Sequence, residues 1–119
     1  MIKKTDLVFI SGPMTGYPNY NRERFYQLEE RIRNDFGCFV INSADIPDGY
    51  TYDEYMLVNE ELVAISDIIV QMDNWNESFG ATREFIWGIK LRKPIMRESQ
   101  LPMEKEMTDL YYKAMENKA

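Results

Sequence analysis

The sequence contains no histidine, and its only cysteine is Cys38. Without histidine, one chain cannot build a Ser-His-Asp or Cys-His triad, nor the usual ligand sets for zinc. A single cysteine cannot form an internal disulfide, and Cys38 begins the apolar run Cys38 to Ile41, which predicts a buried, inert thiol. We therefore expect an acid or base to be Asp, Glu, Tyr or Lys, and we expect neither a metal nor another cofactor.

Long apolar runs and an excess of basic residues are absent as well. The run after Asp6 extends only from Leu7 to Ile10, which is too short for a signal peptide, and no stretch reaches transmembrane length. The formal net charge is −6, so the sequence predicts no broad basic face for a nucleic-acid polymer or an anionic membrane. We expect a cytoplasmic protein that binds neither partner.

Short apolar runs alternate with amphipathic segments along the 119 residues. Strands are expected at Leu7 to Ile10, Cys38 to Ile41, Asp67 to Met72 and Ile95 to Met96. Helices are expected at about Arg22 to Asp35, at Tyr52 to Ile65, from the polar turn of Asn74 to Ser78 as far as Lys93, and at Met103 to Lys118. This order predicts one three-layer α/β domain over residues 1–98, with a mostly parallel sheet of about four or five strands. Residues 99–119 would add a C-terminal helix that packs on the domain or on a partner subunit.

Local residue types predict how these helices end and which way they face. Asn21 is expected to cap the first helix and Gly37 to end it. The inward positions expected for the second helix are Tyr55, Val58, Leu62 and Ile65. An apolar stripe on the tail helix consists of Met107, Leu110, Tyr111 and Met115.

The loop from Ser11 to Gly16 breaks the first strand sharply. Two glycines in this loop permit a close approach of ligand to backbone, and its N–H groups could bind phosphate or sugar oxygens. The loop matches neither the Walker nor the dinucleotide-binding pattern. A tight structural turn is the alternative interpretation.

Two acidic residues, Asp73 and Glu84, follow the third strand. Glu84 is the candidate nucleophile, because a carboxylate can attack an anomeric carbon, and the positive end of its helix is expected to favour the ionised form. Asp73 is expected to orient the substrate or exchange protons with the leaving group. The alternatives are a solvated Glu84 and an Asp73 that only caps a turn.

The remaining candidates lie in the loops that follow the strands. The full set expected to bind substrate is Ser11, Gly12, Pro13, Met14, Gly16, Tyr17, Tyr20, Asn42, Trp75, Ser78 and Gly80. Ser78 could bind a ligand or cap the helix, and the aromatic residues could stack on a base or serve only in packing. In a parallel sheet, the loops after the first and third strands lie at one edge. Asp73 and Glu84 are therefore expected to open into one crevice and to couple electrostatically.

Four short motifs carry a resemblance to a known family. They are I-S-G-P-M-T-G at Ile10 to Gly16, S-D-I-I-V at Ser66 to Val70, W-N-E-S-F-G-A-T-R-E at Trp75 to Glu84, and L-R-K-P-I at Leu91 to Ile95. The start of the first helix, with Asn21 and Phe25, matches as well. Over about Leu7 to Met96 the chain resembles the nucleoside 2-deoxyribosyltransferase-like superfamily, and within it the small phage and bacterial DUF4406 branch.

This resemblance implies a flavodoxin-like, Rossmann-like fold and cleavage of an N-glycosidic bond in a nucleoside or nucleotide. By position, Glu84 matches the nucleophile of the superfamily and Asp73 its active-site aspartate. Ser78 and Gly80 match the segment that binds sugar or phosphate. The resemblance also implies a homodimer or higher homo-oligomer in bacterial or phage-infected cytoplasm. The alternatives are a non-catalytic protein that binds a nucleotide or an ADP-ribose-like ligand, and a phage-host interaction protein.

Overall fold

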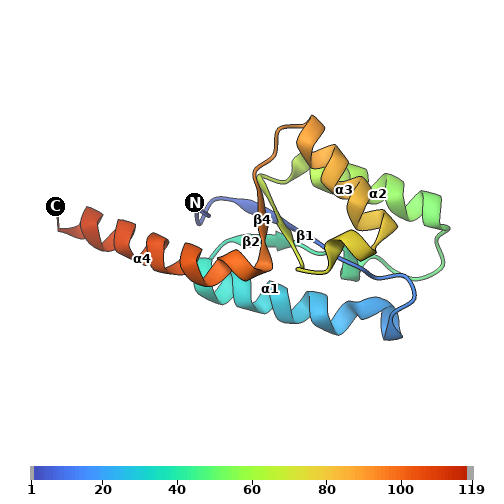
Figure 1. Ribbon diagram of the computed structural model, residues 1–119, viewed down its shortest axis with the longest axis horizontal. Helices are drawn as coiled ribbons and strands as arrows, with labels where there is room; N and C mark the ends of the chain where they lie inside the picture. Colours follow the sequence, from blue (N-terminus) through green and yellow to red (C-terminus); the bar gives the residue numbers. More distant parts are fainter. Residues whose placement is uncertain (1, 118–119) are drawn as a thin grey trace.

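The apolar runs form one parallel sheet in the computed structural model, which describes residues 2–117 (Figure 1). The strands are β1 (Leu7–Ser11), β2 (Phe39–Ile41), β3 (Ile68–Gln71) and β4 (Ile95–Arg97). They lie side by side in the order β2-β1-β3-β4, and every pair is parallel. The predicted α/β fold is confirmed, with a sheet of four strands.

Helices cover both faces of the sheet (Figure 1). They are α1 (Arg22–Phe36), α2 (Tyr52–Ile65), α3 (Phe79–Lys90) and α4 (Leu101–Glu116). Alternate residues of a strand point to opposite faces. On β3, Val70 packs with α1 and the start of α4, whereas Ile69 packs beneath α2 and α3. Burial on both faces explains why these strands are continuously apolar.

The ends of α1 agree with the prediction only in part. Gly37 ends the helix in the left-handed conformation with φ of 67°, as expected of a glycine at this position. The prediction that Asn21 caps the start is wrong. Its own φ is 62°, no side-chain capping bond forms, and its Nδ2 donates instead to the Pro13 carbonyl at 2.8 Å. Asn21 therefore holds the loop after β1 in place.

The inward face of α2 also differs from the predicted one. The buried residues of α2 are Met56, Asn59 and Val63. Val58 and Ile65, which were expected inside, are 41% and 60% exposed. Apolar side chains occur around most of this helix, so their spacing alone does not define one buried face.

Helix α4 projects from the end of the domain (Figure 1). Its first half is anchored, because Leu101 is buried and the Glu104 carboxylate accepts a hydrogen bond from the Ile2 N–H at 2.6 Å. The stripe of Met107, Leu110, Tyr111 and Met115 is between 47% and 66% exposed. The stripe does not pack on the domain, and its burial by a partner subunit stays a prediction. Lys118, the last residue of the predicted helix, lies outside the described residues.

No helix within residues 2–117 is both long enough and apolar enough to cross a membrane.

Candidate active site

The strand order creates a crevice at the carboxyl ends of β1 and β3. After β1 the chain moves to β2 on one side, and β3 then pairs with β1 on the other, so the loops after β1 and β3 diverge from this point. Ligands of open α/β sheets bind at such a switch point. The Met72 N–H donates to the Ser11 carbonyl at 2.8 Å, and Asn74 Nδ2 donates to the Tyr17 hydroxyl at 3.2 Å. The predicted side-by-side placement of the two loops is confirmed.

Glu84 lines a cavity of about 280 Å³ in this crevice. It lies on α3, and its side chain turns inward, leaving only 5% of the residue exposed. The Ser11 hydroxyl donates a hydrogen bond to Glu84 Oε1 at 2.6 Å. Two residues that are 73 positions apart in the chain are thus joined at the floor of the cavity.

The environment of Glu84 favours its neutral form. Burial raises the pKa of its carboxyl to about 8, while the hydrogen bond from Ser11 acts in the opposite direction. The expectation that the helix end would favour the ionised form is therefore wrong. Glu84 lies beyond the first turn of α3, where the N–H groups are already paired and the influence of the helix end has weakened. At neutral pH the resting site holds mainly a carboxylic acid.

Small and polar residues of both loops complete the wall around Glu84. Gly80 and Ser78 line the cavity, and Ser78 also caps α3 by accepting a hydrogen bond from the Ala81 N–H at 3.1 Å. Gly12 lines it too, and a Cβ at this position would lie 2.5 Å from Met72 Sδ. The close approach of Met72 therefore explains the glycine at position 12 without a bound ligand.

Asp73 does not join Glu84. It is exposed, and its carboxylate accepts a hydrogen bond from the Ser99 N–H at 3.2 Å. The prediction that both carboxylates open into one crevice is wrong, because Asp73 does not line the Glu84 cavity. Trp75 is also outside this cavity, because its ring stacks on Phe85 with centroids 4.8 Å apart.

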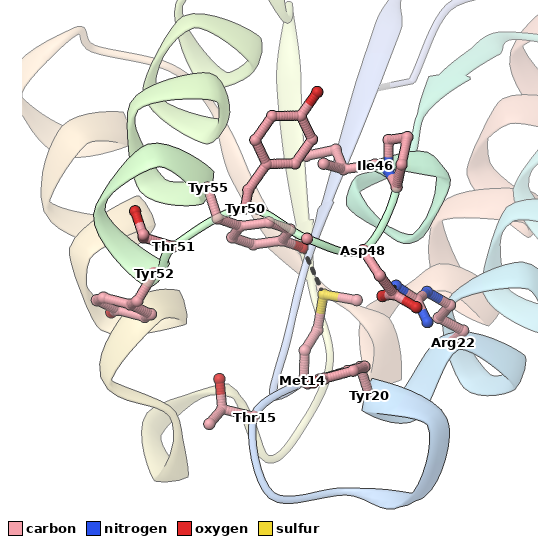
Figure 2. Close-up of a pocket in the computed structure, with 12 residues that line it drawn as sticks. Met14, Thr15, Tyr20, Arg22, Ile46, Asp48, Tyr50, Thr51, Tyr52 and Tyr55 are labelled. Carbon is pink, nitrogen blue, oxygen red and sulfur yellow. Dashed lines mark hydrogen bonds and ion pairs between the residues drawn. The ribbon is translucent and has the colours of Figure 1, made fainter.

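A second hollow of about 280 Å³ adjoins the Glu84 cavity. Figure 2 shows the residues that line it. The two share the lining residues Met14, Thr15, Tyr52 and Tyr55. Tyr20 and Tyr50 add further aromatic side chains to the second hollow. We call it the tyrosine hollow. Figure 2 shows Thr15 and Tyr52 towards one side of it, and the ion pair of Arg22 with Asp48 towards the other.

Tyr55 lies between the two cavities. Its hydroxyl is 2.7 Å from Met14 Sδ, a contact drawn in Figure 2, and 3.3 Å from the Ser43 carbonyl oxygen. Burial raises the pKa of this phenol to about 12, so Tyr55 remains a neutral donor. Behind it, Ser43 Oγ donates to Asn59 Oδ1 at 2.9 Å, and Asn59 Nδ2 has no partner among the described residues.

The other predicted binding residues divide between the two cavities and the scaffold. Pro13, Met14 and Tyr17 line the Glu84 cavity, whereas Tyr20 lines the tyrosine hollow. Gly16 adopts φ of 86° and has open space around it, so it serves the turn.

Asn42 belongs to the scaffold. It is buried, donates to Glu29 and to the Phe25 carbonyl, and accepts from the Ala44 N–H. These bonds hold the loop after β2 against α1, and Asn42 does not line either cavity.

Several lining residues were not predicted from the sequence. Glu77 lines the cavity of Glu84, and its carboxylate is 3.5 Å from the Tyr17 hydroxyl. Its position directly before Ser78, within the quoted motif, could have indicated it. The tyrosines Tyr50, Tyr52 and Tyr55 follow the Asp48-Gly49 turn, and this aromatic cluster next to a strand exit was also a usable signal.

The described residues were also considered as possible metal ligands. Within residues 2–117, no three Cys, Asp or Glu side chains lie close enough together to hold a metal ion. The two cavities are lined by the buried carboxyl group of Glu84, the exposed carboxyl group of Glu77, the ion pair of Arg22 with Asp48, hydroxyl groups and aromatic rings.

Comparison of the sequence with known protein families identifies one match. No curated protein matches the chain. Residues 6–97 match the model of a domain of unknown function, DUF4406. The match covers the four strands, α1 to α3 and both cavities. The chain therefore belongs to the DUF4406 family.

Proposed function

We propose that this protein cleaves or transfers the N-glycosidic bond of a nucleoside or nucleotide, with Glu84 as the nucleophile. One observation carries the proposal: a buried carboxyl group lies in a cavity at the sheet's switch point, and this cavity continues into an aromatic hollow. A sugar would occupy the Glu84 cavity, and the attached base would occupy the tyrosine hollow. Aromatic side chains suit a flat base because their rings stack on its faces.

The reaction uses the ionised form of Glu84. Its carboxylate oxygen attacks C1′ of the sugar, and the bond between C1′ and the base breaks as the new ester bond forms. The base leaves with the electron pair of that bond and takes up a proton from solvent or from an acid of the cavity. Water, or a second base, then releases the sugar from Glu84. The Ser11 hydroxyl, 2.6 Å from Oε1, stabilises the carboxylate before attack.

Glu77 is the second carboxyl group in this cavity. It lines the same cavity as Glu84 and is exposed to solvent, as a group that donates a proton to a leaving base must be able to regain one. We therefore assign to Glu77, in place of Asp73, the protonation of the departing base.

We further propose that the family lies within the nucleoside 2-deoxyribosyltransferase-like superfamily. Support comes from the motif of Trp75 to Glu84, whose last residue is the buried carboxyl group at the sheet edge. Homo-oligomeric assembly and a cytoplasmic location belong to the same proposal.

A mass-spectrometric screen tests the activity. The full chain is incubated with nucleosides, nucleotides and NAD-like compounds, and both free base and a glycosylated protein are measured. The expected result is base release by the wild type and none by Glu84→Gln, which keeps the shape of the side chain but cannot form the ester. The matched control, Glu60→Gln, changes an exposed residue of α2 and should retain turnover. Equal turnover in Glu84→Gln would refute the assignment.

A second candidate is binding of the same ligand without turnover. The raised pKa of Glu84 favours it, because a neutral carboxyl can donate a hydrogen bond to a sugar but is a poor nucleophile. Calorimetric titration separates the two functions. Saturable binding with no base released, even at pH 9 where Glu84 is ionised, supports the binding protein. Base release that rises with pH supports the enzyme.

A further inference from the structure

A third cavity, of about 450 Å³, lies between α3 and the strands β3 and β4. It is bounded by β3 and by the edge strand β4 below, and by α3 above, and it shares no lining residue with the other two cavities. Its volume falls within the range of small-molecule sites. We call it the β4-edge cavity.

Gln71 forms the polar floor of the β4-edge cavity. It is the last residue of β3 and is only 2% exposed, yet its side-chain Nε2 makes no hydrogen bond to any residue that the structure describes. Buried amides almost always have a partner, so a free one at a cavity needs an explanation. The two ends of an amide exchange by rotation about one bond, and either end can then face the cavity.

Positive charge lies beside this amide. Arg97 ends β4 and is in register with Gln71 on the neighbouring strand. Its guanidinium makes no ion pair with any described residue, although the chain carries a net charge of −6. Lys93 also lines the cavity, where its Nζ donates to the Ala64 carbonyl at 2.8 Å. No Asp or Glu is among the lining residues.

Apart from Gln100, whose Oε1 accepts a hydrogen bond from the Arg97 N–H at 2.8 Å, the rest of the wall is apolar. Trp75 and Phe85 stack with centroids 4.8 Å apart, and Ile89 and Ile95 extend the same surface. Helix and sheet approach closely beside it, because a Cβ on Gly88 would lie 2.6 Å from Ile69 Cδ1. An apolar wall that ends in a guanidinium and a free amide is complementary to an amphipathic molecule.

We propose that the β4-edge cavity binds a small organic anion, with a ring or short apolar chain and a terminal carboxylate. The carboxylate would pair with Arg97 and accept a hydrogen bond from Gln71, and the apolar part would lie against Trp75 and Ile89. Arginine suits this role because its guanidinium presents parallel N–H donors to a carboxylate. The β4-edge cavity shares no lining residue with the Glu84 cavity, although Gln71 is the register partner of Ser11, and the proposal does not depend on the function proposed for Glu84.

Titration with 3-phenylpropionate tests the site, with NMR of the uniformly ¹⁵N-labelled full chain as the readout. The expected result is saturable shifts of the Trp75 indole N–H and the Gln71 side-chain N–H₂ signals. Arg97→Met keeps the apolar stem and removes the charge, so affinity should fall by about tenfold, the effect of one charge-assisted hydrogen bond. Lys90→Met is the matched control, because it removes a positive charge from exposed α3 outside the cavity.

A neutral analogue separates the charge from the ring. The wild type should bind 3-phenylpropanamide more weakly than 3-phenylpropionate. Arg97→Met should bind the two compounds with equal affinity. The proposal is overturned if millimolar 3-phenylpropionate moves neither signal, if the shifts map to the tyrosine hollow or α4, or if Arg97→Met and Lys90→Met bind alike.

Discussion

Relative to the wild type, the Glu84→Gln variant should gain stability as the pH rises. The carboxyl of Glu84 has a pKa of about 8 in the folded chain, against an ordinary value of 4.5. The folded state therefore holds this proton more tightly than the unfolded chain does. The resulting stability is fully present below pH 4.5 and is lost as the pH rises through 8. Glutamine has no proton to lose, so the variant should lack this dependence.

The size of the effect follows from the two pKa values. Each pKa unit corresponds to about 1.36 kcal/mol, so the whole contribution is on the order of 5 kcal/mol. Between pH 5 and pH 7.5 the unfolded chain releases the proton and the folded chain retains most of it. Over this interval the wild type should lose about 3 kcal/mol of unfolding free energy that Glu84→Gln keeps. This is a large fraction of the stability of a small domain.

Urea denaturation of both proteins at pH 5, 6, 7 and 7.5 measures the difference. Other titrating groups contribute equally to the two proteins, so the difference between them isolates Glu84. Glu60→Gln, an exposed substitution, should follow the wild type. If the wild type and Glu84→Gln lose the same unfolding free energy between pH 5 and pH 7.5, the argument that burial keeps Glu84 neutral is refuted.

Four further outcomes test the site and the tail. Base release by the wild type should rise with pH to an apparent pKa near 8, and Ser11→Ala should move this midpoint upward, because the carboxylate loses a hydrogen-bond donor. In kinetic assays, Asp73→Asn should leave turnover unchanged, since its contact with the Ser99 N–H lies outside the cavity. Tyr52→Ala should raise the Kd for a nucleoside in calorimetry while leaving the fold intact by circular dichroism. Leu110→Glu should reduce the mass of the assembly measured by sedimentation, because it places a charge in the exposed apolar stripe.

The strands and the sheet were predictable because their signal is local. The run Leu7 to Ile10 is apolar throughout, as burial on both faces requires, and Gly37 supplies a conformation that other residues adopt with strain. The face of α2 was not predictable in the same way. Its apolar residues surround the helix, and Asn59, a polar residue, is fully buried because Ser43 provides a partner from a distant loop.

The candidate site was predictable to the level of loops but not of side-chain directions. Parallel pairing brings the exits of β1 and β3 together, which places Glu84 beside Ser11. The direction of the Asp73 side chain depends on the Ser99 N–H, which belongs to the turn after β4 and has no signature in the motif around Asp73. The pKa of Glu84 depends on how completely packing excludes water, and helix position alone does not report this.

The surface of the whole chain gives an independent reason to expect that α4 is covered. A compact monomer of 14.1 kDa should expose about 6,700 Å². This chain exposes 7422 Å². Its radius of gyration is 15.0 Å, against about 13.5 Å for a compact domain of this length. The excess of about 700 Å² is close to the roughly 800 Å² that each partner buries in a standard interface.

The projecting α4, with Leu110 in its exposed stripe, is the part that makes the chain elongated (Figure 1). Pairing of this stripe with a second copy would bring the exposed area per subunit back to that of a compact chain.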